Sequence, residues 1–464
     1  MKVSPYIFVF LLLFSGCAIG PNFKKPSPQL PKSYRYAESG AGQDSIVNLD
    51  WWKLFKDAAL DSLIRESLRS NKNAEIAYSR IEQARYQLGY TKADLWPSVG
   101  YQGGASHVMP STLSGLKDYD QFSVSGNITW EIDLWGKLRR ANEASREELF
   151  STTEVYNGLL LSLITEVASN YMVLRDLDNR LEISKQTLKS RQEYFDIINQ
   201  RYSKGVAPEW DLRQAEVQVN VALAAIPAFE RSITQTENAI SILCGRNPGP
   251  IARGKSIIDQ TVNPEIPAGL PSQLLANRPD ILAAEHQLAA QNARIGVAQA
   301  MRLPSISLTG MLGVASGELS SLFTGDAVNS SLSAGLFGPI FEFQKNKRRV
   351  DMERAKTFQA QKNYELTVIN AFAEVENSLA GVKTYKDELS AREAQAKAAK
   401  MVADISRSRY DGGITSYLEV LDADRTNFEA QLNASATKQS TLLSYINLYK
   451  ALGGGWNAKK TAKP

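Results

Sequence analysis

Cysteine and histidine are almost absent from this sequence, which contains two of each among 464 residues. A zinc site takes about four Cys, His or carboxylate ligands, so this stock leaves almost nothing for a zinc centre or a thiol enzyme. The sequence also lacks a glycine-rich phosphate loop and any spacing typical of metal ligands. We therefore expect neither catalysis nor a cofactor or metal.

An excess of charge of either sign is lacking as well. Lys and Arg number 53 against 49 Asp and Glu, a net charge of +4. Binding to nucleic acid requires a concentrated basic patch, and this balance does not supply one. A basic run at 345–349 lies just after a predicted strand, where it is expected to face an interface or solvent. No nucleic-acid partner is expected.

Long apolar runs are also missing, since no stretch reaches the roughly 18 uninterrupted apolar residues of a transmembrane helix. The apolar segment 3–14 follows Lys2 and has the length of a secretory signal core. It ends in Leu13-Phe14-Ser15-Gly16-Cys17, which resembles a bacterial lipobox, although Phe14 stands where leucine is usual. We expect residues 1–16 to be a lipoprotein signal peptide and Cys17 to be lipidated. An ordinary signal peptide with an incidental cysteine is the alternative.

The two halves of the chain repeat one another across a Pro- and Gly-rich stretch at 246–276. Equivalent positions lie 207 to 209 residues apart: Leu88-Gly89 and Ile295-Gly296, Pro97 and Pro304, Asp133 and Glu342, Tyr202 and Tyr410, Gly205 and Gly413, Gly245 and Gly453. A chance match would not keep this register over so many residues. The chain is therefore predicted to be a tandem duplication.

Each half is predicted to contain a helix, a strand pair, a long helix and a shorter helix. The long helix of the first half is expected from Lys137 to Ser203, because its apolar residues alternate at spacings of four and three, the heptad pattern of a coiled coil. Asn170, Ser184 and Arg191 interrupt this apolar seam. The matching helix is expected at about 345–411, and shorter helices at about 71–95, 208–244, 278–302 and 415–452. Each long helix would extend about 100 Å.

Strands are predicted between the helices, at about 97–108, 121–134, 304–315 and 331–343. Residues 121–134 alternate strictly between apolar and polar side chains, which is typical of a barrel strand with lipid outside and a polar lumen. Trp96 and Trp135 stand at helix–strand junctions, where membrane-interface aromatics are expected. A soluble hairpin is the alternative, weakened by the recurrence of the pair. Four strands leave open edges in lipid, so several copies must close one barrel and enclose a tunnel.

Motifs along nearly the whole mature chain resemble the outer-membrane factors, the TolC-like exit ducts of efflux pumps, in the lipoprotein branch (NodT/OprM-like) that serves RND-type multidrug pumps. The matching segments are Cys17-Ala-Ile-Gly-Pro-Asn-Phe, Trp51-Trp52 with Phe55 and Asp57, Glu131-Ile-Asp-Leu-Trp-Gly136, Leu270-Pro-Ser, Asn277-Arg-Pro-Asp-Ile281 and Asn447-Leu-Tyr-Lys-Ala-Leu-Gly-Gly-Gly-Trp456.

The resemblance implies an α+β membrane protein and a homotrimer. The long coiled-coil helices would form a periplasmic α-barrel, and four strands per chain would contribute to a twelve-stranded outer-membrane β-barrel. It also implies a periplasmic adaptor protein and an inner-membrane RND-type transporter as partners, contact with outer-membrane lipid, and a role as the passive exit channel of a tripartite efflux pump. A type I protein-secretion duct is one alternative, and a non-transporting coiled-coil structural lipoprotein is another.

On this interpretation the chain divides into six segments. They are a signal peptide (1–16), a lipid-anchored extended arm (17–50), a first repeat (51–245), a Pro/Gly-rich linker (246–276), a second repeat (277–456) and a C-terminal tail (457–464).

A permanently open tube would leak, so a constriction is expected, and the helix ends far from the strands are the candidate place for it. Ionisable residues crowd there, and the candidate gate residues are Asp196, Arg201, Asp404, Arg407 and Arg409. Asp404 and Arg407 lie three residues apart and can share one helical face; a solvated charged helix end is the alternative. The turns that contain Tyr202 and Gly205, and Tyr410 and Gly413, resemble the adaptor-docking tip of the family.

Overall fold

The computed structural model describes residues 18–27, 31, 34–36, 50–110, 117–260 and 275–454. Cys17, the signal peptide and the C-terminal tail lie outside these residues. The chain forms two compact units. Unit 1 comprises Met1–Pro28, Ser79–Glu154 and Ala283–Leu366, and unit 2 comprises Gln29–Tyr78, Val155–Leu282 and Thr367–Pro464. Each unit combines segments of both sequence repeats, so the repeat is a unit of sequence and not a unit of packing.

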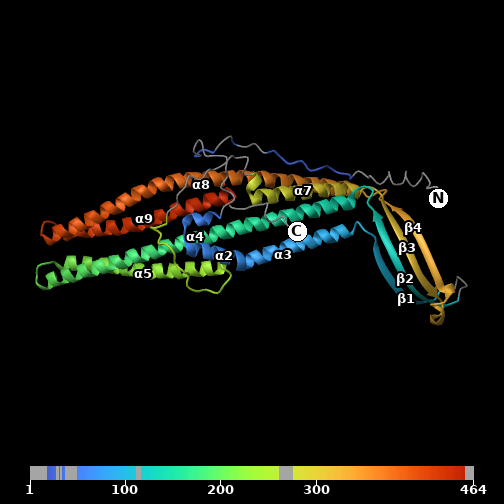
Figure 1. Ribbon diagram of the computed structural model, residues 1–464, viewed down its shortest axis with the longest axis horizontal. Coiled ribbons are helices and arrows are strands. Elements are labelled where there is room, and N and C mark those ends of the chain that lie inside the picture. The colour runs from blue at the N-terminus through green and yellow to red at the C-terminus, as the bar shows by residue number, and fades with distance from the viewer. Residues whose placement is uncertain are drawn as a thin grey trace. The chain divides into compact units, whose positions relative to one another are not determined.

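The helices follow the predicted order, and their ends lie within about two residues of the predicted ones (Figure 1). They are α3 (Lys72–Ala93), α4 (Lys137–Ser203), α5 (Glu209–Leu243), α7 (Pro279–Ala300), α8 (Lys345–Asp411) and α9 (Tyr417–Ala451). The two long helices, α4 and α8, have 67 residues each, as the repeat predicts. None of the helices in the described part of the chain combines the length and apolar character that crossing a bilayer requires.

One α-helix in the described part of the chain, α2 (Ala58–Ser70), was not predicted. After the short helix η2 (Trp51–Phe55), α2 begins with Asp57 as its N-cap. The carboxylate of Asp57 accepts hydrogen bonds from the backbone N–H groups of Ala59 and Leu60, which satisfies two of the free donors of the first turn. The buried face of α2 has helical spacing and contains Leu60, Leu63, Ile64 and Ser67.

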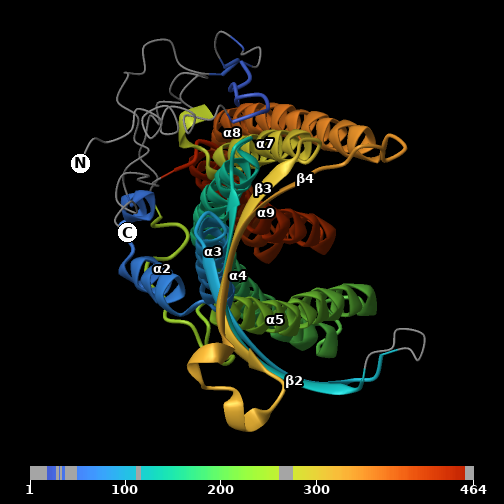
Figure 2. The same ribbon diagram turned by 90° about the vertical axis from the view of Figure 1, so that its right-hand side faces the viewer.

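The four strands form one antiparallel sheet in the order β1-β2-β3-β4, and the sheet is visibly curved (Figure 2). They are β1 (Ser98–Val108), β2 (Tyr119–Ile132), β3 (Ser305–Ser316) and β4 (Val328–Phe337). The short helices η4 (Leu319–Ser321) and η5 (Gly325–Ala327) lie between β3 and β4. The prediction of 331–343 for the last strand was wrong at its end. Gly338-Pro339 follows Phe337, and proline has no N–H to continue the ladder.

The sheet, which belongs to unit 1, leaves apolar side chains uncovered. Tyr101 of β1 and Leu332 of β4 are 91% and 86% exposed. Within the described chain β1 pairs only with β2, and β4 only with β3, so both outer strands keep a free edge. In the same unit α7 runs along the first half of α8, and the Thr357 hydroxyl donates to the carbonyl of Gln291. In unit 1, α7 and α8 are therefore bonded to each other, whereas the sheet keeps an unpaired edge on each side.

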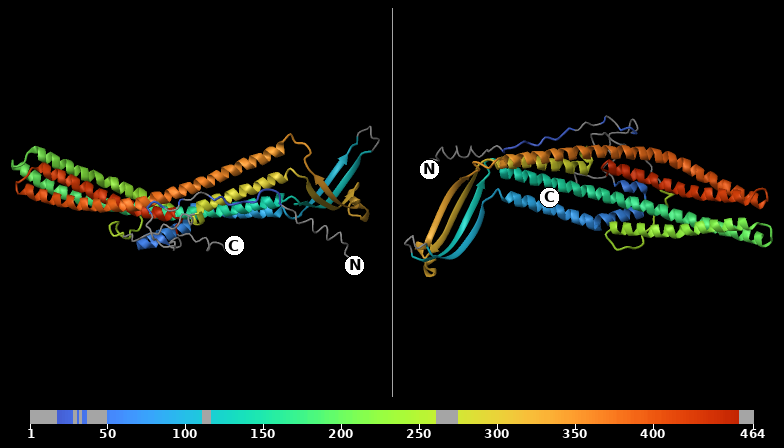
Figure 3. Two further views of the ribbon diagram at one scale, coloured as in Figure 1. Left: turned by 90° about the horizontal axis from the view of Figure 1, so that it is seen from above. Right: turned by 180° about the vertical axis from the view of Figure 1, so that it is seen from behind.

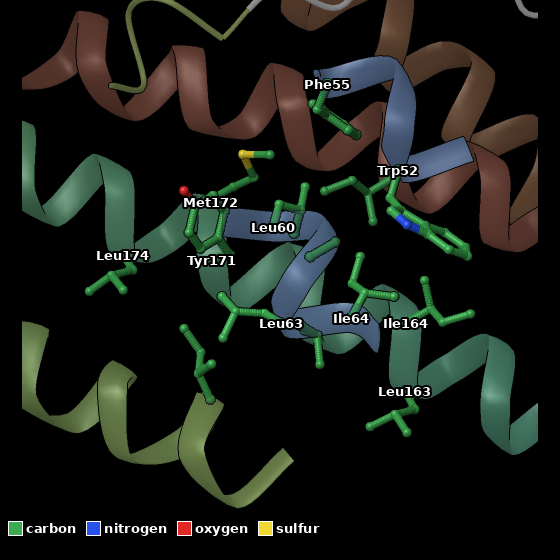
Figure 4. Close-up of a cluster of buried hydrophobic side chains, with 14 of the residues drawn as sticks. Trp52, Phe55, Leu60, Leu63, Ile64, Leu163, Ile164, Tyr171, Met172 and Leu174 are labelled. Carbon is green, nitrogen blue, oxygen red and sulfur yellow. The ribbon is translucent and has the colours of Figure 1, made fainter. Parts of the chain in front are cut away.

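Unit 2 has a large apolar core, built where α2 and η2 pack on the middle of α4 (Figure 4). Trp51 stacks on Tyr449 of α9 with 5.1 Å between ring centroids, and Tyr171 and Met172 of α4 are fully buried. Beyond this core, α5 returns beside the second half of α4 and α9 beside the second half of α8 (Figure 3). The unit therefore combines this core with two helical hairpins, each ending in a short turn.

Candidate functional site

The turns that end the two hairpins have the same backbone geometry. At the α4–α5 turn, the N–H of Gly205 donates to the carbonyl of Tyr202 and the N–H of Val206 donates to the carbonyl of Arg201, both at 2.8 Å. This pair of bonds is a Schellman motif, which requires a left-handed residue, and Gly205 has φ +74°. The α8–α9 turn repeats both bonds at Tyr410 and Gly413 and at Arg409 and Ile414, with Gly413 at φ +71°.

Apolar side chains project from both turns. Val206 and Ile414, at equivalent positions of the two repeats, are 74% and 70% exposed, and Trp210 and Leu418 are also equivalent and exposed. A Cβ atom on Gly205 or Gly413 would meet nothing within 4 Å. The two tyrosines predicted to belong to the docking tip differ: Tyr202 is exposed, whereas Tyr410 is half-buried against neighbouring rings.

A tyrosine–arginine cluster ties the two hairpins together just inside these turns. Its members come from three helices: Arg191, Tyr194 and Arg201 of α4, Arg407, Tyr410 and Asp411 of α8, and Tyr417 and Asp424 of α9. Tyr194 stacks on Tyr417 with 6.0 Å between centroids, and Tyr410 lies against both rings. The guanidinium of Arg201 lies 5.1 Å from the centroid of the Tyr410 ring, which is a cation–π contact.

Ion pairs join the same elements. Arg201 pairs with Asp411 at 3.2 Å, so a charge near the end of α4, in the first repeat, meets a charge at the end of α8, in the second. Arg407 pairs with Asp424 at 2.7 Å, and this pair is less exposed than the first. Exposed pairs contribute about 0–1 kcal/mol each. Removing one partner of a partly buried pair costs more, because it leaves an uncompensated charge away from water.

Within one chain, Arg407 has its partner on another helix and not on its own. The Arg407 side chain reaches across to α9, where the Asp424 carboxylate is withdrawn from solvent and needs a cation. Of the predicted gate residues, the cluster therefore brings together Arg201 and Arg407. Arg409 pairs separately with Glu419 at 3.3 Å, and Asp196 accepts a hydrogen bond from Gln192.

Burial raises the pKa values of an aspartate and two tyrosines in the cluster. Withdrawal from solvent raises the pKa of Asp424 above its usual value, although Arg407 and Arg191 oppose the shift. Burial, followed by the nearby Asp411 carboxylate, raises the pKa of Tyr194. Burial also raises the pKa of Tyr417, so both phenols stay neutral at physiological pH.

Sequence reasoning missed Asp424 as a functional residue, although a signal was present. Tyr417, Leu421, Asp424 and Phe428 are spaced four, three and four residues apart, so Asp424 occupies an apolar seam position of α9. Arg191 interrupts the seam of α4 in the same way; it is 4% exposed, and its guanidinium lies over the ring of Phe428. A charge at a seam position predicts a buried polar contact but not its partner, which for Asp424 is Arg407.

The predicted interface tryptophans lie at the junctions in unit 1. Trp96 is 69% exposed, whereas the indole N–H of Trp135 donates to the carbonyl of Pro304 at 2.7 Å. A third tryptophan, Trp130, was not singled out; its indole donates to the carbonyl of Leu95 just before β1. In the part of the chain that the structure describes, no group of three or more His, Cys, Asp and Glu side chains is placed to hold a metal ion.

The sequence of this chain is similar to a protein-family model and to proteins of known function. A family model described as "Outer membrane efflux protein" matches residues 63–246 and 270–454, in two parts that follow the two repeats. The cation efflux system protein CusC of Escherichia coli is 31% identical over 457 residues, covering 97% of this chain and 98% of that protein. The solvent efflux pump outer membrane protein SrpC of Pseudomonas putida is 33% identical over 469 residues, covering 99% and 100%.

Solved structures agree with the sequence matches. The CmeC outer membrane channel of Campylobacter jejuni superposes with a TM-score of 0.90 at 26% identity, covering 96% of each chain. The open state of the MtrE outer membrane channel of Neisseria gonorrhoeae superposes with a TM-score of 0.85 at 29% identity, covering 95% of this chain and 98% of that one.

Proposed function

The chain belongs to the outer membrane efflux protein family, and on that premise we propose that it is the passive, trimeric exit duct of a tripartite pump. It would carry drugs or other small molecules from a periplasmic pump to the exterior and would perform no catalysis. The observation that supports this most directly is the four-stranded sheet with two free edges and exposed apolar side chains. In lipid those edges must be paired, and further copies of the same sheet can pair them.

The test is conductance. Purified protein would be reconstituted in planar bilayers, and its oligomeric mass in detergent would be measured by light scattering. We expect stepwise single-channel currents and a particle of three chains. A monodisperse monomer, or a folded trimer that passes no current, would contradict the proposal.

The second part of the proposal is that Cys17 is the lipid-carrying mature N-terminus and holds the chain in the outer membrane. The lipobox-like sequence before Cys17 supports it. Cys17→Ala should abolish metabolic labelling with palmitate, whereas Cys244→Ala, at the one other cysteine, should leave labelling unchanged. Persistent labelling of Cys17→Ala would show that the assignment is wrong.

The third part concerns partners. We propose that a periplasmic adaptor, itself bound to an inner-membrane RND-type transporter, docks on the exposed apolar side chains of the two turns. The equivalence of Val206 with Ile414 supports one repeated docking surface. Val206→Asp with Ile414→Asp should abolish co-purification of the adaptor and restore drug sensitivity while conductance persists. Lys204→Asp, a charge change in the same turn, is the matched control and should have a smaller effect.

The fourth part concerns the gate. We propose that the tyrosine–arginine cluster keeps the duct closed at this end, since it links the two hairpins by ion pairs and stacked rings. The MtrE channel, a solved relative, has been captured in an open state, which supports an opening step. Arg407→Ala with Asp424→Ala should raise basal conductance, whereas Asp404→Ala should not. An unchanged conductance in the folded double variant would place the gate elsewhere.

A further inference from the structure

The first described residues of the chain lie in a narrow groove on unit 1 and are hydrogen-bonded to it. The segment Ala18–Asn22 follows the proposed lipid attachment residue directly. The N–H of Ile19 donates to the carbonyl of Trp135 at 3.0 Å, three residues after the end of the strand β2. From the other side, the Asn292 amide of α7 donates to the carbonyl of Pro21 at 2.9 Å. We call the surface formed by Trp135, Gly136, Arg140, Asn292 and Gly296 the N-terminal slot.

The buried side chain of Arg140 makes most of its hydrogen bonds to this segment. It is 5% exposed, and its guanidinium donates to the carbonyls of Ile19 and Gly20 and, at 2.7 Å, to the side-chain oxygen of Asn22. Its remaining amino group pairs with Glu143. A buried guanidinium is stable only when such acceptors surround it, so the segment supplies most of the partners that keep Arg140 inside.

Glycines let the backbones approach closely. Gly20 has φ +113°, and a Cβ atom there would lie 2.5 Å from the Cα of Gly296. A Cβ atom on Gly296 would in turn lie 2.7 Å from the carbonyl oxygen of Ile19, and one on Gly136 would lie 2.7 Å from the Cα of Ala18. Contacts this short tolerate no side chain, so the slot is specific for the path that this segment takes.

The sequence repeat provides an internal comparison. Gly89 is equivalent to Gly296, and Arg349 to Arg140. A Cβ atom on Gly89 would meet nothing within 4 Å, and Arg349 contacts Asn346 and the sulfur of Met301 instead of an arm. The glycine and the arginine are thus present in both repeats, but among the described residues only the pair Arg140 and Gly296 holds a bound segment.

We propose that the N-terminal slot is the receptor for the mature N-terminus and fixes where the acyl chains of Cys17 enter the membrane, beside Trp135, just after the end of β2. Cys17 precedes Ala18 by one peptide unit, about 3.8 Å between Cα atoms. The lipid and the strand therefore reach the membrane at one place and act as a pair of linked anchors. Arg140 is the positioning residue. This inference rests on the proposed lipidation of Cys17.

The slot itself is tested by proteolysis, with a control from the other repeat for each change. Trypsin can cut after Lys24, which is exposed, and the cut separates the N-terminal peptide from the rest of the chain. Gly296→Ala and Arg140→Met should speed this cut about tenfold, because the bound segment opens more often. Gly89→Ala and Arg349→Met should leave the rate unchanged. Gly296→Ala replaces a mid-helix glycine with the best helix former, so loss of folding does not explain its effect.

Intact mass gives the rate of cleavage in Cys17→Ser, which cannot be acylated, as well as in the wild type. The slot comparison therefore stands even if Cys17 carries no lipid. Equal cleavage rates in all four variants and the unmutated chain would overturn the slot.

The place of the lipid is tested by metabolic labelling with a palmitate analogue that carries a photoreactive diazirine. After irradiation, cross-linked peptides should map near residues 132–138 and 303–306 in the unmutated chain, and this preference should be lost in Arg140→Met but kept in Arg349→Met. Labelled protein whose cross-links spread evenly, or fall on membrane lipid alone, would overturn the proposed entry point. Absence of label would refute the lipidation and not the slot.

Discussion

Asp57 organises the middle of unit 2 through a single buried carboxylate. It is 4% exposed, and its two oxygens accept from five donors: the N–H groups of Ala59, Leu60 and Lys255, the Tyr171 hydroxyl and the Gln260 amide. One residue thereby caps α2 and ties the loop after α5 to α4. Gly254 lies so close that a Cβ atom there would overlap the carboxylate.

Asp57→Asn should therefore be costly, because it replaces one acceptor oxygen with a donor that faces other donors. We expect the free energy of unfolding to fall by about 2–3 kcal/mol. Asp61→Asn is the matched control, since Asp61 accepts from Arg65 and Trp52 at the surface, and it should cost less than about 1 kcal/mol. Urea unfolding followed by tryptophan fluorescence measures both. Equal losses would contradict the role assigned to Asp57.

Asp424 predicts a dependence on pH. Its folded-state pKa is raised by burial, against Arg407 and Arg191 and with Asp404 adding to the rise. The folded state, in which Asp424 is buried, is therefore most favoured below the ordinary aspartate pKa. It loses this contribution to stability as the pH rises through the raised pKa of Asp424. If opening hydrates Asp424, basal conductance should fall as the pH is lowered from 7 toward 4. Asp424→Asn should remove that part of the dependence, and Asp404→Asn should retain it.

At the scale of elements, the hairpin turns depend on one left-handed residue each. Gly205→Ala places a Cβ in the left-handed region, which costs about 1–2 kcal/mol per residue. The N–H of Val206, which bonds to Arg201, should then exchange with solvent several-fold faster. Gly412→Ala is the control, because Gly412 precedes the left-handed Gly413 and has no positive φ. Unchanged exchange at Val206 would mean that the turn is held by something other than its glycine.

The elements were largely predictable from local signals, and their partners were not. The ends of α4 follow from its heptad seam and from the glycine after Ser203, which are both visible in the sequence. The end of β4 was misjudged because apolar alternation continues past Gly338-Pro339, although the proline cannot join the ladder. The partner of Arg407 within the chain was not predicted, and in the structure its side chain bonds to Asp424 of α9. The facing residue depends on how two helices pack, which spacing within one helix does not contain.

At the scale of the whole molecule, the repeat predicts how copies would pair in the proposed trimer. Gly103 and Gly310 are equivalent; they pair with Val124 and Leu332 respectively, which makes those two equivalent as well. Within one chain, the pairing of β2 with β3 joins the two repeats and places Ser125 opposite Gly313. Shifted by one repeat, that pair becomes Ser333 of one copy opposite Ser106 of the next.

Ser333→Cys with Ser106→Cys should therefore form a disulfide between copies under mild oxidation, visible as dimers and trimers in denaturing gels without reductant. Ser331→Cys with Ser106→Cys is the control, because it is two residues out of register on the same face. Among the described residues the native Cys244 is buried, so it does not compete. Preferential cross-linking of the control would mean that the repeat does not set the register between copies.

Because Val206 and Ile414 are nearly equivalent, the number of altered positions around the ring can be varied. In a ring of three such chains, a substitution in one repeat alters every second position, and the unaltered half of the ring acts as an internal reference. A paired substitution alters all six. Any property that needs the full circle can thus be separated from one that needs only alternate positions, by comparing Val206→Asp, Ile414→Asp and the two together. In a channel built from six identical single-repeat chains, one substitution would alter all six positions at once, so this comparison could not be made.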